Sequence, residues 1–290
     1  MMAKPIRTIW VLAAVLLLAA CNVNPATGKR QFNTLSTSRE IELGKKAAPD
    51  FVTKLGGEID SQEIRDYTSE IGRRLAAAGE RPTLPWKFTV VDSQVLNAFA
   101  LPGGKVFISR GLLEKLEDEA MLAGVLAHEI GHTTAQHIGQ QMTQKMILAG
   151  VATAAGVAAS SSDSDWLRVL GVGTSVGGGL YLLKFGRGQE SQADELGIKY
   201  MTREGYDPNG MIRVLQILAC VAKGAPRSEI FSTHPAPAKR IERATSYVNK
   251  NFPDAGNSNQ YVVNAVRFRQ VVLDELAKLP PPRHGATETK

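Results

Sequence analysis

The segment from Glu117 to Met146 constrains the fold of this chain more than any other part of the sequence. Its apolar residues recur at helical spacing behind an acidic beginning, which predicts one long helix with an apolar stripe. The segment contains His128-Glu129-Ile130-Gly131-His132, whose spacing of four puts both imidazoles on one face of the helix, about one turn apart. Two ring nitrogens can then reach one metal ion, so this helix is expected to carry the chemistry.

Zinc suits this pair of histidines, because it accepts imidazole and carboxylate ligands in tetrahedral geometry and keeps one position for water in a catalytic site. Glu129 directly follows the first histidine, where its carboxylate can take a proton from that water, as the general base of a metalloprotease does. No serine or cysteine nucleophile is required. The alternative is a pair of surface histidines on an amphipathic helix, with Gly131 as an unexplained weak point. Gly131 would otherwise permit close backbone approach beneath the metal.

Two histidines leave the protein ligand set incomplete. His137 lies five residues beyond His132, about 140° round the same helix, so it is expected to point elsewhere, as a surface or cap residue. Position 138 is isoleucine, so the third histidine that metzincins place six residues after the second is missing. A distant glutamate is the better candidate, and Glu190 stands on a separate predicted helix with Asp194 one turn further along. Taken alone, this acidic pair would be a solvated face.

The chain carries several motifs in a fixed order. They are the segment Asn97 to Gly104 before the catalytic helix, His-Glu-x-x-His, then Glu-x-x-Ala-Asp at Glu190, then Ser-Thr-His-Pro around His234 with Arg240 six residues later. Together these motifs resemble metallopeptidase family forty-eight, which includes HtpX-like and BepA-like bacterial proteases and the CAAX prenyl proteases. The resemblance covers about Ser38 to Val248. HtpX and the prenyl proteases carry several true membrane spans, whereas this chain has two short apolar segments and looks more like the lipoprotein branch.

The resemblance implies one zinc ion per chain with Glu190 as its third ligand, beside His128 and His132. It also implies that Asp194 accepts a hydrogen bond from a histidine ligand, His128, and so fixes the tautomer and ring angle of that histidine. Glu129 keeps the role of the catalytic base.

The same resemblance implies that Asn97 and His234 face the substrate and stabilise the oxyanion of the tetrahedral intermediate. Otherwise His234 is a loop histidine held by Pro235, and Asn97 is a turn residue that satisfies its own backbone. Arg240 is expected either to bind acidic neighbours near the site or to cap a helix.

The first twenty residues predict a secretory signal, because two basic residues precede an apolar run from Ile9 to Ala20 that is too short to span a bilayer comfortably. The run ends in Leu18-Ala19-Ala20-Cys21, which resembles the bacterial lipobox and predicts lipidation of Cys21. A plain cleavable signal, or a short membrane anchor with an incidental cysteine, is the alternative. Asn22 in place of an aspartate favours the outer membrane, facing the periplasm, by the sorting rule known for enterobacteria.

The rest of the chain predicts an α+β fold. Residues 21–37 are polar and predict a tether, and residues 38–250 predict a mainly helical, zincin-like metalloprotease domain with a small antiparallel sheet beside the active-site helix. An apolar Ala/Gly-rich insert at 146–183 is interpreted as a helical hairpin or lid, with membrane dipping as the alternative. Residues 251–290 predict a C-terminal helix and a disordered tail.

The two short β-like runs are Trp86 to Val91 and Lys105 to Ser109, with a Pro-Gly-Gly turn between them. Ser38 and Ser61 are predicted caps of two helices that pack over the catalytic core. Cys220 lies in an apolar run and is expected in the core, and no disulfide framework is expected. The formal charge of +6 falls to +4 once the basic residues Lys4 and Arg7 leave with the signal, which does not argue for nucleic acid.

These features predict a membrane-anchored zinc endopeptidase that cleaves protein or peptide substrates, especially misfolded or unassembled envelope proteins, in quality control. A chaperone or assembly factor for outer-membrane proteins with little proteolysis is the competing hypothesis, and processing of one particular partner is a third. An edge strand of the sheet is expected to receive an extended substrate segment by main-chain pairing.

Overall fold

The computed structural model describes residues 21–148, 162–170, 183–224, 234, 238–256 and 259–283. Most of the insert that the sequence places at 146–183 lies outside these residues, and so does the choice between a lid and a membrane-dipping segment. The described elements follow one another in this order: β1 (Cys21–Val23), β2 (Arg30–Phe32), α2 (Thr37–Lys54), α3 (Gln62–Ala77), β3 (Lys87–Val91), β4 (Ala98–Leu101), β5 (Lys105–Ser109), α4 (Arg110–Leu113), α5 (Glu119–Thr134), α6 (His137–Leu148), α8 (Asp163–Val169), α9 (Arg187–Arg203), α10 (Asn209–Gly224), α12 (Ala238–Asn251), α13 (Ala265–Phe268), η2 (Arg269–Leu273) and α14 (Asp274–Leu276).

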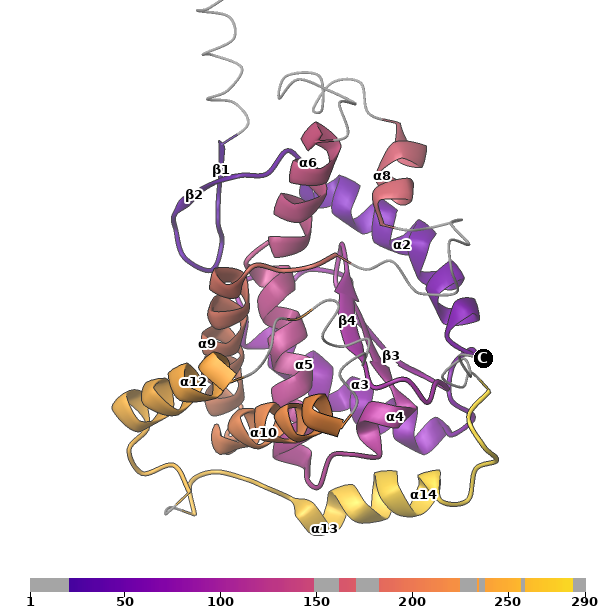
Figure 1. Cartoon of the computed structure of the whole chain (residues 1–290), viewed down its shortest axis with the longest axis vertical. Helices are drawn as coiled ribbons and strands as arrows, with labels where there is room; N and C mark the ends of the chain where they lie inside the picture. Colours follow the sequence, from indigo (N-terminus) through magenta and orange to yellow (C-terminus); the bar gives the residue numbers. More distant parts are fainter. Residues whose placement is uncertain are drawn as a thin grey trace, which may run out of the picture.

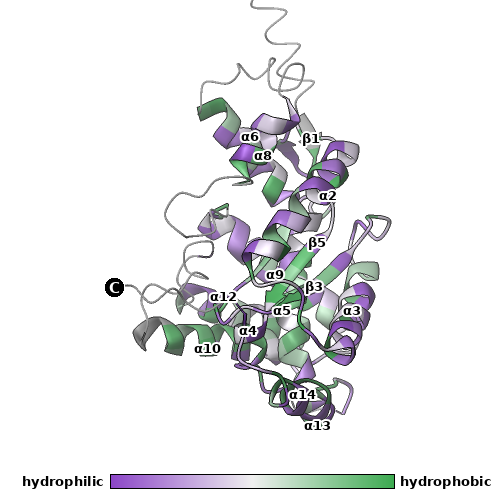
Figure 2. Ribbon diagram, turned by 90° about the vertical axis from the view of Figure 1, so that its right-hand side faces the viewer, coloured by the Kyte–Doolittle hydropathy of each residue, from purple (hydrophilic) through white to green (hydrophobic). Residues whose placement is uncertain are grey.

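Helix α5 lies at the centre of the molecule, with α9 and α10 packed on one side and the sheet and α3 on the other (Figure 1). All of its residues are buried, so it is a core helix and not an amphipathic surface helix. Asp118 caps its N-terminus by accepting a hydrogen bond from the backbone N–H of Met121 at 2.8 Å. Figure 2 shows the same organisation, with hydrophobic colour concentrated on the central strands and α5.

The mainly helical α+β fold is confirmed, but the sheet is mixed and not antiparallel. Its strand order is β3-β5-β4, with β3 parallel to β5 and β4 antiparallel to β5. The sequence interpretation missed β4, because Ala98–Leu101 was included in the turn. The turn itself lies at Gly103 and Gly104, which have φ of 72° and 80°. An extra strand between the two predicted runs reverses the chain once more, so these two runs become parallel.

The predicted long helix from Glu117 to Met146 is in fact two helices. Helix α5 ends at Thr134 and α6 begins at His137, because Gln136 adopts a left-handed backbone conformation with φ of 56°. The side-chain amide of Asn24 donates to the carbonyl oxygen of Ala135 at 3.0 Å, and the Gln31 amide donates to the side chain of Gln136. Contacts from a distant segment therefore stabilise the break.

Those contacts come from residues that the sequence assigns to a tether. β1 and β2 form an antiparallel hairpin, and Asn24, Asn33 and Leu35 are buried. Asn24 also accepts hydrogen bonds from the backbone of Ala26 and Thr27, which closes the turn. Part of the 21–37 segment is therefore packed against the helix break and is not an extended tether.

The C-terminal part of the chain is also packed further than the sequence suggests. α13, η2 and α14 form one helical run, in which Phe268 and Val272 are fully buried against the core cluster. Arg110 donates to the carbonyl oxygen of Pro280 at 2.7 Å, and Arg283 donates to the carboxylate of Asp92 at 2.8 Å. The expected disordered tail therefore does not include the residues up to 283.

Helix α8 is the described part of the insert, and it packs against α2 and α6. Trp166 is buried there, and Asp163 pairs with Arg39 at 2.6 Å.

No helix among the described ranges is long and apolar enough to cross a membrane. Cys220 is exposed, contrary to the expectation of a core position, because α10 buries the face of Leu215 and Leu218 while Cys220 lies on another face.

Candidate metal centre and active site

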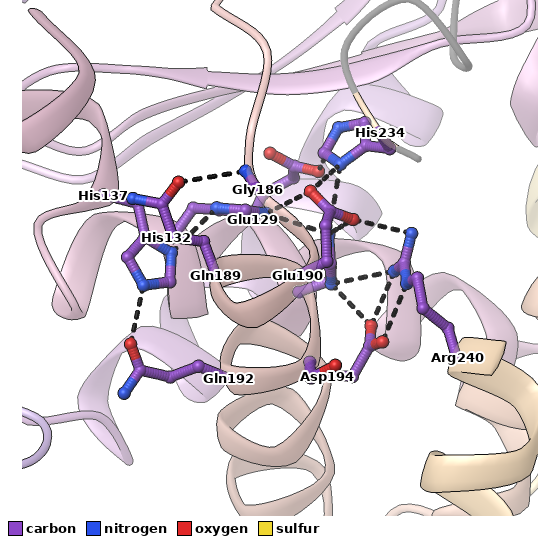
Figure 3. A network of polar contacts seen from close by, with 12 residues as sticks. Glu129, His132, His137, Gly186, Gln189, Glu190, Gln192, Asp194, His234 and Arg240 are labelled. Atoms are coloured by element: carbon purple, nitrogen blue, oxygen red, sulfur yellow. Dashed lines mark hydrogen bonds and ion pairs between the residues drawn. The ribbon is translucent and has the colours of Figure 1, made fainter. Parts of the chain in front are cut away.

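Four buried side chains from three parts of the chain, two of them on α5, converge at one point. They are His128, His132, Glu190 and His234, and one ligand atom from each lies within 4.8 Å of the others. The Nε2 atoms of His128 and His132 are 3.0 Å apart, and Glu190 Oε1 lies 3.4 Å from His132 Nε2. Figure 3 shows the side chain of Glu190, on α9, pointing towards His132 and His234. The structure thus brings together the three predicted ligands and adds His234 to them.

Close packing of α5 on α9 sets this geometry. A side chain at Gly131 would place its Cβ 2.8 Å from the carbonyl oxygen of Ala193, and one at Gly197 would meet the backbone N of His128 at 3.1 Å. Either substitution would force the two backbones apart. Gly131 therefore has the role that one of the two sequence interpretations gave it, close backbone approach beneath the ligands.

A charged network supports His128. Its Nδ1 lies 2.9 Å from Asp194 Oδ1, and Arg240 donates to both oxygens of Asp194, at 2.8 and 2.6 Å. Arg240 also pairs with Glu190 Oε2 at 2.7 Å. Because a carboxylate only accepts, His128 donates through Nδ1, and its Nε2 lone pair faces the other ligands. Asp194 and Arg240 therefore lie where the sequence reasoning expected them.

The charges of this network shift the titration of both carboxyl groups. Burial would raise the pKa of Asp194, but the neighbouring Arg240 guanidinium outweighs it and lowers that pKa. Burial acts in the same direction on Glu190, and His234, His132 and Arg240 together hold its pKa below the usual range. Both groups are therefore carboxylates at neutral pH, the form in which Glu190 can bind a metal.

The Nδ1 side and the ring face of His132 meet neutral groups, whereas its Nε2 faces Glu190. Phe185 stacks on its ring with centroids 3.9 Å apart, and His137 Nδ1 lies 3.0 Å from His132 Nδ1. Burial lowers the pKa of His132 well below its usual value, so the ring is neutral. The prediction that His137 points elsewhere is wrong. It assumed a continuous helix, and the break at Gln136 turns His137 back towards the site.

His234 lies inside the ligand group and not at its edge. Its Nδ1 is 2.8 Å from Glu190 Oε1 and 3.4 Å from His128 Nε2, and its Nε2 is 3.8 Å from Glu129 Oε1. Burial would lower the pKa of His234, but the negative charges of Glu190 and Glu129 raise it. In this arrangement His234 occupies a fourth position around the point where the ligands meet. The family resemblance implied a substrate-facing role for His234, and no pattern in the sequence indicates this placement.

Glu129 and Asn97 are the remaining predicted site residues. Glu129 is buried, its Oε2 has no hydrogen-bond partner among the described residues, and burial raises its pKa against the opposing charges of His234 and His128. Asn97 precedes β4 and is buried, and its side-chain amide atoms also have no partner in the described part of the chain. Both side chains retain hydrogen-bonding capacity.

The donor set fits zinc. Tetrahedral zinc with bonds of about 2.0–2.2 Å places its ligand atoms about 3.3 Å apart, which matches the 3.0 Å and 3.4 Å separations described above. The charges also fit, since the ionised carboxylates of Glu190 and Asp194 against the single Arg240 guanidinium leave negative charge in a buried site. A bound cation offsets it.

Two apolar pockets flank the ligand group. The first has a cavity volume of about 30 Å³, and the second, next to the edge strand β4, about 10 Å³. The first pocket is lined by Ala98, Leu112, Val125, His128, Glu129, Met211, Val214, Leu215, Leu218, His234 and Arg240. The second is lined by Phe99, Ala100, Leu101, Leu170, Leu183, Phe185 and His234.

A buried His-Glu-x-x-His helix with a carboxylate ligand from a second helix defines the class of zinc-dependent metallopeptidases. Comparison with known families agrees, since the profile of Peptidase family M48 matches residues 64–248. The chain belongs to this family.

Individual relatives support the assignment to the same class. The chain is 31% identical to the beta-barrel assembly-enhancing protease of Yersinia pestis over 84% of its own length and 51% of the relative, and 29% identical to the protein of that name in Escherichia coli (strain K12) over 81% and 49%. It is 28% identical to the mitochondrial metalloendopeptidase OMA1 of Schizosaccharomyces pombe over 77% of this chain and 65% of that protein. The chain spans about half the length of the first two relatives. The chain thus carries the candidate ligand group of a zinc metallopeptidase within a domain of family M48.

Proposed function

We propose that this protein is an envelope endopeptidase in which His128, His132 and Glu190 hold one zinc ion and Glu129 acts as the catalytic base. The observation that carries the proposal is the buried Glu129 carboxylate, which directly follows a ligand and has one oxygen without a hydrogen-bond partner among the described residues. When bound, zinc lowers the pKa of a water molecule and polarises the carbonyl of the scissile bond.

The chain's own residues supply the proton transfers. Glu129 takes a proton from the attacking water as the water oxygen bonds to the carbonyl carbon, and it passes this proton to the leaving nitrogen as the C–N bond breaks. A raised pKa suits a group that must hold and then release a proton. Asp194 and Arg240 keep His128 in the tautomer that presents Nε2.

With His234 in its present position, four protein side chains would hold the ion and leave no place for water, so His234 would have to move away first. Once displaced from Glu190, its ring can donate a hydrogen bond to the oxyanion, the role that the sequence resemblance implies. Asn97 is proposed as a second donor, since its buried side-chain amide has no other partner among the described residues.

The substrate side chains are proposed to be apolar. Strand β4 pairs with β5 alone within the described sheet, so its other edge is available for main-chain pairing with an extended substrate. Glu129 borders the first pocket and delivers its proton to the leaving nitrogen, so the residue that carries this nitrogen places its side chain there. We therefore expect cleavage before apolar residues, which unfolded proteins expose.

The location and the physiological substrate are proposed from the N-terminal sequence and from the relatives. The lipobox-like sequence supports a lipid anchor at Cys21, and relatives named for β-barrel assembly support a role on unassembled outer-membrane proteins in the bacterial envelope. The same names also favour the competing function, an assembly factor with little proteolysis. In both cases the domain would act from the membrane surface, in quality control.

Cleavage of unfolded casein by the full chain, purified in detergent, tests the proposal. Wild type should cut, and Glu129→Gln should cut at least about 100-fold more slowly, since general acid–base catalysis contributes about 10²–10⁴-fold. Zinc content should be equal in the two proteins. Equal cleavage by both would remove Glu129 from the mechanism, and zinc binding without cleavage by wild type would favour the assembly factor.

A further inference from the structure

One buried histidine has no task in the mechanism above. His137 is 1% exposed and begins α6, immediately after the break at Gln136. Its two ring nitrogens contact different partners: Nδ1 lies 3.0 Å from His132 Nδ1, and Nε2 lies 2.7 Å from the side-chain oxygen of Gln192 (Figure 3). Burial of this kind, with both nitrogens engaged, sets the ring orientation.

The hydrogen-bond directions along the series Gln192, His137 and His132 follow from the Gln192 oxygen. The Gln192 oxygen only accepts, so His137 donates through Nε2, and a neutral ring then accepts through Nδ1. The His137 ring is buried, and burial favours the neutral form of a histidine. His132 therefore donates through Nδ1 to His137, and its Nε2 carries a lone pair directed at Glu190 and His128.

We infer that His137 and Gln192 form a positioning pair that holds His132 in the tautomer required of a zinc ligand. The inference rests on the proposed metal site. Without the pair, His132 could equally place its proton on Nε2, and the ring would have to change tautomer before it binds the ion. Groups that accept from a ligating histidine typically contribute 10–100-fold to metal affinity.

The fold provides this pair through a long-range contact. A continuous helix would direct His137 away, so the left-handed residue Gln136 is needed, and Asn24 of the N-terminal hairpin bonds the carbonyl of Ala135 at 3.0 Å. Gln192 stands on α9, two residues before Asp194. α9 thus supports both histidine ligands, His128 through Asp194 and His132 through Gln192.

Zinc affinity, measured by competition with a chromophoric chelator, tests the pair in the full-length protein. His137→Leu should bind zinc about 10–100-fold more weakly, since it removes the acceptor. His137→Asn keeps an oxygen near the position of Nδ1 and should recover most of the affinity. The matched control is Gln141→Leu, which removes another α6-to-α9 hydrogen bond of 2.7 Å, to Gln189, and touches no ligand. Its affinity should equal that of wild type.

A spectroscopic readout separates tautomer control from general stability. Nitrogen NMR of the metal-free protein should show His132 protonated at Nδ1 in wild type and a mixture of tautomers in His137→Leu. Wild-type affinity in His137→Leu, no recovery in His137→Asn, or an equal loss in Gln141→Leu would overturn the inference. Each of these results leaves the metal site intact, whereas absence of zinc from wild type would overturn the proposed function together with the pair.

Discussion

The two histidine ligands on α5 are one turn apart, yet they are supported in opposite ways. His128 rests on a charged network, in which Asp194 accepts from its ring and Arg240 binds Asp194 and Glu190. His132 rests on neutral groups, His137 and the stacked ring of Phe185. A buried carboxylate needs a cation to offset its desolvation, whereas a neutral ring needs only an acceptor. The charged side should therefore dominate stability, and both sides should affect metal affinity.

Loss of Arg240 should produce the largest effect. Arg240→Met leaves the carboxylates of Asp194 and Glu190 buried without their cation, which should destabilise the metal-free protein by about 3–5 kcal/mol. Zinc should restore part of that loss, because it neutralises Glu190. Urea denaturation with and without zinc measures both quantities. Arg243→Met, an exposed neighbour on the same helix, serves as the control and should change stability by less than about 0.5 kcal/mol. A similar small change in Arg240→Met would refute the charged network.

Zinc affinity should decrease measurably when the acceptor on the charged side, Asp194, or the acceptor on the neutral side, Gln192, is altered. Asp194→Asn keeps an acceptor oxygen for His128 but removes its charge, and we expect zinc affinity to decrease about 10–100-fold. Gln192→Leu acts on His132 only through His137, so its effect should be at most a few-fold. Chelator competition on the two variants ranks the two sides. The reverse order would mean that the neutral side determines the affinity.

The neutral side should also change the pH dependence of stability. The pKa of His137 is lowered to about 4 in the folded protein, so between about pH 4 and pH 6.5 the unfolded chain binds a proton that the folded chain does not. Metal-free protein should therefore lose stability as pH falls through this window, by up to about 3 kcal/mol for this group. His137→Asn should flatten that part of the profile. An unchanged dependence of stability on pH in His137→Asn would mean that other groups cause it.

Much of the site could be predicted from local sequence. The spacing of His128 and His132 depends only on helix geometry, and Ser61 was correctly predicted to cap α3, because its side chain accepts from the backbone N–H three residues later. Glu190 and Asp194 lie one turn apart on one helix, as expected. Each of these features follows from residues within one or two turns of each other.

The features that the sequence did not predict depend on contacts between distant segments. The break after α5 needs Asn24, more than a hundred positions earlier, to bond Ala135, and no local pattern predicts a left-handed Gln136. Because the break was not predicted, His137 was assigned to the wrong face. Strand β4 was missed for a related reason, since only pairing with β5 distinguishes a short apolar run from a turn.

Zinc content measured together with zinc X-ray absorption tests the central claim most directly. The purified full chain should contain one zinc ion per molecule, bound only by nitrogen and oxygen ligands at about 2.0–2.2 Å, with imidazole scattering. Glu190→Ala should lose most of the metal under the same purification. Zinc bound through sulfur, or a wild-type protein that retains no zinc after exposure to it, would contradict a centre built on His128, His132 and Glu190.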